Sequence, residues 1–341
     1  MTLTVAVIGL GYFSQFHLDA WNRSPAAHIV GVCDGDQART EAQALEFDVP
    51  GYTDPETLLA HTDPQVIDIV APPHAHADLI RSCLKPGRLI ICQKPFCTSV
   101  DEAQDIIDLA DQHGTRIVIH ENFRFQPWYR EIQGFLGSGR MGPVYQARFD
   151  LRPGDGRGPA AYLDRQPAFQ KMPRLLIHET AVHFIDVFRW LFGPIESVYA
   201  DLRRLNPVIL GEDAGVLLLH HADGPTTVFD GNRLSDHVAD NLRHTMGEFM
   251  IEGEGGKLTL DGNGQIRFRL FGADEAETLP ITRSVDDAAF GGGCVAALIN
   301  HVIDAVERNA PLENEARDYL TVMHVSEAAY RSAAEGRRID L

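Results

Sequence analysis

The chain has 341 residues, with 30 Lys and Arg against 48 Asp and Glu, so its formal net charge is −18. This balance argues against nucleic acid and anionic membranes as partners, because both bind cationic protein surfaces. The length exceeds the size at which one hydrophobic core usually keeps growing, and the composition, 44% hydrophobic and 23% charged, is ordinary for a globular protein. We expect two domains and a neutral small molecule as the ligand.

The cysteines and apolar segments bear on the compartment. The sequence has five cysteines: Cys33, Cys83, Cys92, Cys97 and Cys294. They form no Cys-x-x-Cys pair and are odd in number, which is typical of a reducing compartment and of a protein without a zinc cluster. Residues 4–13 lack the flank and cleavage site of a signal peptide, and no stretch approaches the ~20 apolar residues that span a bilayer. We expect a cytoplasmic location.

Residues 3–21, LTVAVIGLGYFSQFHLDAW, predict a strand, a glycine turn and a helix. Gly9 allows a tight turn, Gly11 lets the backbone approach a pyrophosphate, and the helix N-terminus holds the negative charge. Ser14 takes the third glycine position and is small enough for it. A turn of this kind also occurs in α/β proteins that bind no dinucleotide.

The second apolar run, residues 28–36, ends at Asp34, about 20 residues after the glycines, where a carboxylate accepts the ribose hydroxyls of a dinucleotide. A carboxylate there repels a 2′-phosphate, which favours NAD over NADP. Arg39 is near enough to leave NADP as an alternative.

The remainder of residues 1–121 alternates between helical and strand patterns. Helices are predicted at 54–61, 75–84 and 98–114, and strands at 65–73, 87–95 and 115–123. Such alternation predicts a doubly wound parallel sheet, an α/β Rossmann domain. Ligands of these sheets bind beyond the carboxyl ends of the strands. This places Pro72, Pro73, His76, Lys94 and Pro95 on the cofactor side.

Residues 122–341 have a different pattern. Strands are predicted at 143–152, 195–205, 215–221, 225–232, 248–262 and 265–272, without intervening helices. A helix at 175–192 precedes most of them, and two amphipathic helices lie within 294–336. We expect an α+β domain with a large, mostly antiparallel open sheet for substrate binding and oligomerisation. Gly291, Gly292 and Gly293 are interpreted as a flexible linker.

The helix at 175–192 contains His178, Glu179 and His183. At 3.6 residues per turn the two histidines are separated by ~140° around the helix, which is too far for one zinc ion, so no metal site is expected. Glu179, His183 and Asp186 instead share a stripe. A carboxylate beside an imidazole suits a general base that takes a proton from an alcohol. A helix-stabilising pair is the alternative.

Lys94 ends a buried strand beside a proline. In a cofactor cleft it could hydrogen-bond the nicotinamide ribose and a substrate hydroxyl. Alternatively, its side chain could simply reach solvent.

Five motifs follow one another in this order: GLGYFS (9–14), APPHAH (71–76), QKP (93–95), ENFRFQP (121–127) and YRSAAEGRRIDL (330–341). On these motifs and the helix at 175–192, the chain resembles the Gfo/Idh/MocA oxidoreductase family over essentially its whole length. The resemblance implies an NAD(P) Rossmann domain, and catalysis by Lys94 and His183 with Glu179 as the family acid. It also implies a sheet domain that often forms the oligomer interface. Gln93 replaces the usual glutamate, which removes a charge beside Lys94. Glu179 replaces the more frequent aspartate, which changes the reach of the carboxylate toward the substrate by one methylene.

The expected site residues fall into two groups. The cofactor group is Gly9, Gly11, Tyr12, Phe13, Ser14, Asp34, Pro72, His76, Gln93, Lys94 and Asn122. The substrate group is Arg124, Gln170, Arg174, His178, Glu179 and His183. For Asn122, Arg124, Gln170 and Arg174, a surface or sheet-edge role is the alternative.

The resemblance implies an NAD-dependent dehydrogenase that oxidises a carbinol of a neutral sugar or polyol, in which His183 takes the hydroxyl proton and hydride passes to NAD. Several segments look like a bacterial subgroup associated with pentose dehydrogenation, with apiose as the leading substrate. An inositol, other cyclitol or hexose dehydrogenase is an alternative. A non-catalytic regulator that senses NAD and a sugar is an alternative of another class. A homodimer or homotetramer through the C-terminal sheet is expected.

Overall fold

The computed structural model describes residues 2–286, 289–308 and 310–341. The chain divides into two compact units. The first contains the residues up to Asn122 together with Val295–Thr321, and the second contains Phe123–Cys294 with Val322–Leu341. The division predicted between residues 121 and 122 differs in that Val295–Thr321 joins the first unit.

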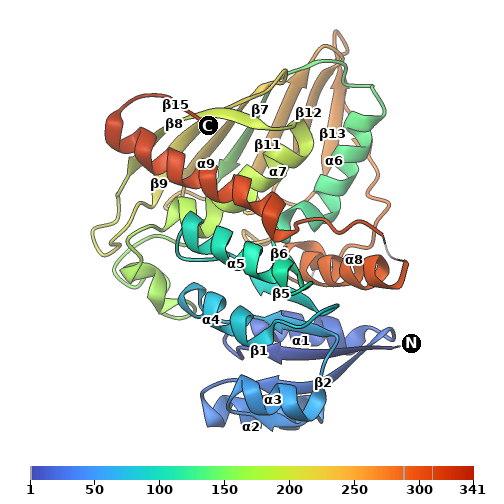
Figure 1. Cartoon of the computed structure of the whole chain (residues 1–341). Helices are drawn as coiled ribbons and strands as arrows, with labels where there is room; N and C mark the ends of the chain where they lie inside the picture. Colours follow the sequence, from blue (N-terminus) through green and yellow to red (C-terminus); the bar gives the residue numbers. More distant parts are fainter. Residues whose placement is uncertain (1, 287–288, 309) are drawn as a thin grey trace. The chain divides into compact units, whose positions relative to one another are not determined.

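The first unit is built on a six-stranded parallel sheet in the order β3-β2-β1-β4-β5-β6 (Figure 1). The strands are β1 (Leu3–Ile8), β2 (Ala27–Cys33), β3 (Gly51–Tyr52), β4 (Val66–Ile69), β5 (Leu89–Gln93) and β6 (Arg116–His120). Every residue of β4 and β5 is buried. Strands that are buried along their whole length are typical of a parallel sheet covered on both faces, and the predicted Rossmann fold is confirmed.

The helices of this unit are α1 (Ser14–Arg23), α2 (Gln37–Phe47), α3 (Pro55–Thr62), α4 (Pro73–Cys83), α5 (Val100–Gln112), α8 (Cys294–Arg308) from Val295 onward, and the beginning of α9 (Ala316–Glu335) as far as Thr321. Side chains of Asp36, Asp54 and Ser99 cap α2, α3 and α5 by accepting backbone N–H groups of the first turn. Neither α1 nor α4 has a side-chain cap. No side chain therefore competes with an anion at the starts of these two helices.

Residues after α8 extend the edge of the parallel sheet. The backbone N–H of Ile119 in β6 donates to the carbonyl of Asn314 at 2.8 Å, and Val118 forms an antiparallel bridge with Glu315. This pairing explains why residues 295–321 group with the first unit, which the sequence pattern did not indicate.

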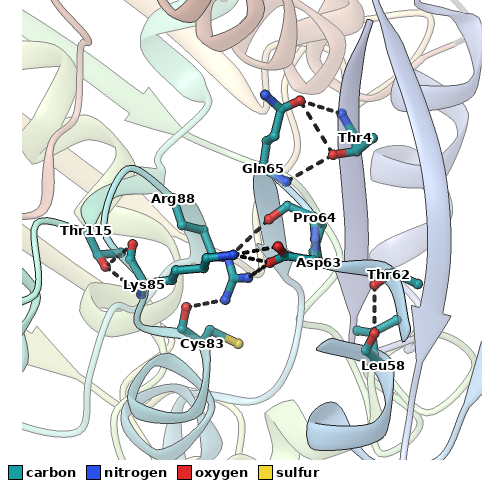
Figure 2. Close-up of polar contacts among 10 residues, drawn as sticks. All are labelled: Thr4, Leu58, Thr62, Asp63, Pro64, Gln65, Cys83, Lys85, Arg88 and Thr115. Atoms are coloured by element: carbon teal, nitrogen blue, oxygen red, sulfur yellow. Dashed lines mark hydrogen bonds and ion pairs between the residues drawn. The ribbon is translucent and has the colours of Figure 1, made fainter. Parts of the chain in front are cut away.

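A polar tie joins the beginnings of β4 and β5 (Figure 2). The buried Arg88 donates to the carbonyls of Pro64 at 3.1 Å and Cys83 at 2.8 Å. It also pairs with Asp63 at 2.8 Å, and Asp63 accepts a second ion pair from Lys85. The tie fixes the two loops that enter neighbouring strands at the end of the sheet opposite the glycine turn.

The second unit contains a nine-stranded sheet in the order β14-β13-β12-β11-β7-β10-β9-β8-β15. Its strands are β7 (Val144–Leu151), β8 (Ile195–Arg203), β9 (Ala214–His221), β10 (Thr226–Asn232), β11 (Gly247–Gly253), β12 (Gly256–Leu260), β13 (Ile266–Leu270), β14 (Glu277–Leu279) and β15 (Ile339–Asp340). Neighbouring strands are antiparallel except β7 and β10, which are parallel. The predicted α+β domain with a mostly antiparallel sheet is confirmed.

Figure 1 shows helices over one face of this sheet. They are α6 (Pro127–Gly137), α7 (Val182–Phe192) and the part of α9 (Ala316–Glu335) from Val322 onward. Short helical turns lie at Phe123–Phe125, Pro167–Lys171 and Phe290–Gly293. Helix α6 was not predicted from the sequence, because its two glycines weaken the helical pattern.

Aromatic packing fixes α7 on the sheet. Phe149, Phe229 and Phe249 are in register on β7, β10 and β11 and are buried. Phe184 of α7 stacks on Phe149 with ring centroids 3.9 Å apart and lies 5.4 Å from Phe229. Full burial of such rings provides about 1.5–3 kcal/mol each. This core packs α7 against the sheet.

The glycines at 291–293, interpreted from the sequence as a flexible linker, belong to the short helical turn Phe290–Gly293. Gly291 and Gly292 are buried and have φ of 55° and 66°. A Cβ on Gly291 would lie 2.8 Å from the Gln126 side chain. Glycine is needed here for backbone conformation and close packing.

Candidate active site

The glycine turn between β1 and α1 has the geometry of a phosphate site. Gly9 has φ +95°, and a Cβ there would lie 2.6 Å from the Val70 carbonyl carbon. A Cβ on Gly11 would meet no heavy atom within 4 Å. The buried Ser14 replaces the third glycine, and its hydroxyl donates to the Gly11 carbonyl at 2.7 Å. The turn therefore leaves open space in front of the uncapped start of α1.

Tyr12 and Phe13 complete the turn. Tyr12 is exposed, and its ring meets Phe16 edge to face with centroids 6.0 Å apart. Phe13 is half-buried against Phe16 and His17. Their expected contact with the cofactor stays a prediction.

The carboxylate of Asp34 is fixed at the end of β2. One oxygen accepts the backbone N–H of Leu10 at 2.8 Å, and the other accepts that of Asp36 at 2.9 Å. Arg39 lies 3.4 Å from Asp34 and 3.1 Å from Asp36. Its guanidinium thus has two carboxylate neighbours. The arrangement fits the ribose hydroxyls of NAD better than a 2′-phosphate.

The loop after β4 presents Pro72 at the surface, whereas His76 is fully buried. One ring nitrogen of His76 lies 2.7 Å from the Ala71 carbonyl, and the other lies 2.9 Å from that of Phe96. Burial lowers the pKa of His76, and the carbonyls oppose that effect. The histidine holds the loop after β4 beside the segment that follows Lys94, and a direct cofactor contact stays a prediction.

Lys94 follows β5 and is half-buried. Its backbone N–H donates to the side-chain oxygen of Gln93 at 3.1 Å. The side-chain nitrogen of Gln93 lies 2.8 Å from His17 Nε2 and 3.3 Å from His120 Nδ1. Asn122, where the first segment of this unit ends, is also buried. Gln93 and Asn122 therefore have little exposed surface for a ligand.

In the second unit, His183 is held by an aromatic face. Its ring is parallel to that of Phe123 within 3°, with centroids 3.9 Å apart. Asp186, one turn later on α7, is fully buried and binds Arg124 through both oxygens. Because Phe123 and Arg124 are adjacent, His183 and Asp186 face the same short turn.

The segment before α7 is not the regular α-helix of 3.6 residues per turn that was assumed from the sequence. Leu176–Ala181 forms a π-helix, whose hydrogen bonds join residues five apart. The separation of His178 and His183 calculated for 3.6 residues per turn is therefore wrong. Such turns are frequent at functional sites. Among the described residues, no group of three or more His, Cys, Asp or Glu is arranged to hold a metal ion.

A buried arginine supports the π-helix. Arg233 donates to the Thr180 hydroxyl at 2.7 Å, to the Tyr162 oxygen at 2.8 Å and to Asp155 at 3.0 Å. Burial opposes its charge, but Asp155, Tyr162 and Glu179 raise the pKa of Arg233 above its usual value. Glu179 and its neighbour Thr180 are therefore both within the influence of one buried cation.

Three expected substrate residues have protein partners. The Gln170 amide donates to the Ala161 carbonyl at 2.8 Å. Arg174 pairs with Glu327, and its guanidinium lies 4.4 Å from the centre of the Tyr330 ring. The third, Arg124, is bound by Asp186. Their roles toward a substrate stay predictions.

Models of one family match both parts of the chain. Residues 3–121 match the model described as "Oxidoreductase family, NAD-binding Rossmann fold". Residues 129–259 match the GFO/IDH/MocA C-terminal domain. The chain belongs to the Gfo/Idh/MocA oxidoreductase family. It is an NAD-dependent oxidoreductase, so the predicted enzyme class and cofactor are confirmed.

Similar proteins extend along nearly the whole chain of this Gfo/Idh/MocA oxidoreductase. D-apiose dehydrogenase of Paraburkholderia graminis is 28% identical over 98% of this chain and 89% of its own. Inositol 2-dehydrogenase of Rhizobium meliloti is 23% identical and covers both chains completely. An oxidoreductase from Agrobacterium radiobacter, solved in complex with NAD⁺, L-tartaric acid and magnesium, superimposes with a TM-score of 0.90 at 26% identity, covering 100% of this chain and 98% of the other.

Some residues that hold the expected site residues of this oxidoreductase in place were not predicted from the sequence. Arg233 and Asp155 carry no motif, because they lie in loops far apart in the chain. Asp68 and His120 left a signal: each is a polar residue within an apolar strand pattern.

Every helix in the described part of the chain is too short or too polar to span a membrane.

Proposed function

We propose that this oxidoreductase oxidises a carbinol of a neutral sugar or polyol, with apiose as the leading substrate. The observation that carries the proposal is the similarity to D-apiose dehydrogenases of Paraburkholderia graminis and Rhizobium rhizogenes over 98% of the chain. Lys94 and His183 stand at the family's catalytic positions. NAD supplies the hydride acceptor.

In the proposed reaction the carbinol carbon loses a hydride, the hydroxyl loses a proton and a carbonyl forms. His183 takes the hydroxyl proton on an imidazole nitrogen, and the stacked Phe123 ring holds the plane of that imidazole. Glu179 orients the substrate or the imidazole, and Lys94 donates a hydrogen bond to the substrate oxygen. His178, in the same π-helix, contacts other hydroxyls.

The test compares the wild type with Lys94→Ala and His183→Ala. The wild type should produce NADH from neutral sugars, and each variant should lose about 10²–10⁴-fold in kcat, the usual contribution of an acid or base. For His183→Ala the affinity for NAD, measured by calorimetry, should remain within about twofold of the wild type. Turnover of His183→Ala within a few fold of the wild type would show that the base is another residue.

A cyclitol or hexose dehydrogenase is the second candidate, favoured by the full-length similarity to inositol 2-dehydrogenase. The panel of sugars therefore includes inositols and hexoses. A regulator that only senses NAD and a sugar would bind both and form no NADH with any of them.

Assembly and location are part of the same proposal. We place a homodimer or homotetramer interface on the face of the nine-stranded sheet that the helices leave uncovered, where Leu218, Val228 and Met250 are half-buried.

A cytoplasmic location is supported by five buried free cysteines, Cys33, Cys83, Cys92, Cys97 and Cys294.

A further inference from the structure

Four buried polar side chains meet beside Lys94 in the first unit. They come from different elements: His17 from α1, Asp68 from β4, Gln93 from β5 and His120 from β6. Their exposed fractions are between 0% and 7%. Gln93 and His120 are in register on adjacent strands, and Asp68 is in register with Ile91, two residues before Gln93. The three strand residues therefore point to the sheet face that α1 covers.

Only one assignment of donors and acceptors fits the hydrogen bonds of this cluster. The backbone N–H of Lys94 can only donate, so the group of Gln93 that faces it is the oxygen. The NH₂ group of Gln93 must then face both imidazoles, donating to Nε2 of His17 and to Nδ1 of His120. Each of these nitrogens must carry a lone pair.

The proton of His17 follows from the same argument. With its Nε2 accepting from Gln93, the ring carries hydrogen on Nδ1, which lies 2.7 Å from Asp68. The same Asp68 oxygen accepts the indole N–H of Trp21 at 2.7 Å. Lys94 therefore donates to Gln93, Gln93 donates to His17, and His17 donates to Asp68. Both imidazoles are neutral in this arrangement.

A glutamate at position 93 would change the charge of this cluster. A carboxylate has no hydrogen to give, so His17 would have to donate from both nitrogens and become a cation between two carboxylates. The amide gives the same acceptor to Lys94 without these buried charges, which are costly to desolvate.

We propose that Gln93 is a positioning residue: anchored by His17 and Asp68, it holds the backbone of Lys94 and keeps the end of β5 free of formal charge. The inference rests on the proposed function, because it assigns Gln93 to the reaction in which Lys94 takes part. If the side chain at position 93 only filled space, an apolar residue would be favoured, because burying a polar group costs free energy.

The direction of the hydrogen bonds is tested without substrate, by ¹⁵N NMR of the histidine rings, with His17→Gln and His120→Gln used for assignment. The wild type should have neutral His17 with hydrogen on Nδ1, and Gln93→Glu should have doubly protonated His17. Hydrogen on Nε2 of wild-type His17, or a cationic wild-type ring, would overturn the inference.

The positioning role is tested by amide hydrogen exchange at Lys94 and by kinetics. Gln93→Leu should remove the protection of the Lys94 amide and reduce kcat about tenfold or more, since small displacements of catalytic groups are costly, with NAD affinity unchanged. Gln93→Glu keeps an acceptor for Lys94 and should restore both. Trp21→Phe is the matched control: it removes a hydrogen bond to Asp68 outside the path to Lys94 and should leave kcat within about twofold.

The outcomes separate the two proposals. Unchanged exchange and kcat in Gln93→Leu, or an equal loss in Trp21→Phe, would overturn the positioning role. If the wild type forms no NADH with any sugar, the proposed function fails, while the ring protonation and Lys94 exchange still decide whether Gln93 anchors this backbone.

Discussion

The Asp34 carboxylate is the residue that we expect to select the cofactor. It is held by two backbone N–H groups and lies beside Arg39. Asp34→Asn keeps the shape, removes the charge that repels a 2′-phosphate and leaves Arg39 with one carboxylate neighbour fewer. We predict that the ratio of kcat/KM for NADP to that for NAD rises by at least about tenfold, or about 1.4 kcal/mol.

The double variant Asp34→Asn with Arg39→Ala is the control for this prediction. If Arg39 provides the new phosphate contact, most of the gain disappears when it is removed. An unchanged cofactor ratio in Asp34→Asn would contradict the role given to the carboxylate.

The parallel stacking of His183 on Phe123 gives a second prediction at this scale. Phe123→Leu removes the flat surface and should lower kcat about tenfold by loosening the imidazole. Phe149→Leu changes a core ring that stacks on Phe184 instead. It should reduce thermal stability but leave kcat nearly unchanged. Equal losses of kcat in the two variants would mean that Phe123 acts only through stability.

Individual residues differ in how far the sequence predicted them. The glycine turn at Gly9 and Gly11 and the place of Asp34 after β2 were predictable, because this turn requires those residue types at that spacing. The partners of Arg124 were not, because its pairing with Asp186 depends on how two distant segments pack. Arg233 lacked any local signal for the same reason.

At the level of elements, the tie between the beginnings of β4 and β5 should make stability depend on pH. The hydrogen bond from Lys85, followed by the charges of Lys85 and Arg88, lowers the pKa of Asp63, and burial opposes this. The folded pKa is below the unfolded one. The carboxylate therefore stabilises the fold above the unfolded pKa, and this contribution is lost as pH falls through the folded pKa.

Asp63→Asn measures this contribution. Asp63 has φ 39°, a left-handed conformation that asparagine tolerates, so the substitution removes charge without adding backbone strain. Urea titrations should find the variant less stable than the wild type at neutral pH, with a difference that shrinks below about pH 4, near the ordinary aspartate pKa. A difference that grows on acidification would have the wrong sign.

Most elements were predictable because burial on both faces gives continuous apolar strands, and burial on one face gives alternation. The π-helix at Leu176–Ala181 was not, since a change from four-residue to five-residue hydrogen bonding leaves the residue pattern helical. That difference matters for the site, because it changes the directions in which His178 and Glu179 point relative to α7.

At the scale of the whole molecule, one face of the nine-stranded sheet has a row of side chains in register: Tyr199, Leu218, Val228, Arg148 and Met250. If copies associate through this face, a charge in the row should prevent association. We predict that Leu218→Asp elutes as a monomer with light-scattering detection, while the wild type is a dimer or tetramer. Val238→Asp, at an apolar residue 86% exposed outside the row, should leave the assembly unchanged.

Our proposed function makes this family member a dehydrogenase of a neutral sugar or polyol. The most direct measurement is kcat/KM from NADH absorbance for D-apiose beside other pentoses, hexoses and inositols. We predict NADH formation from a neutral sugar or polyol, with D-apiose the best substrate by at least about tenfold, or about 1.4 kcal/mol of transition-state stabilisation. Protein that binds NAD but forms no NADH with any of these compounds would contradict it.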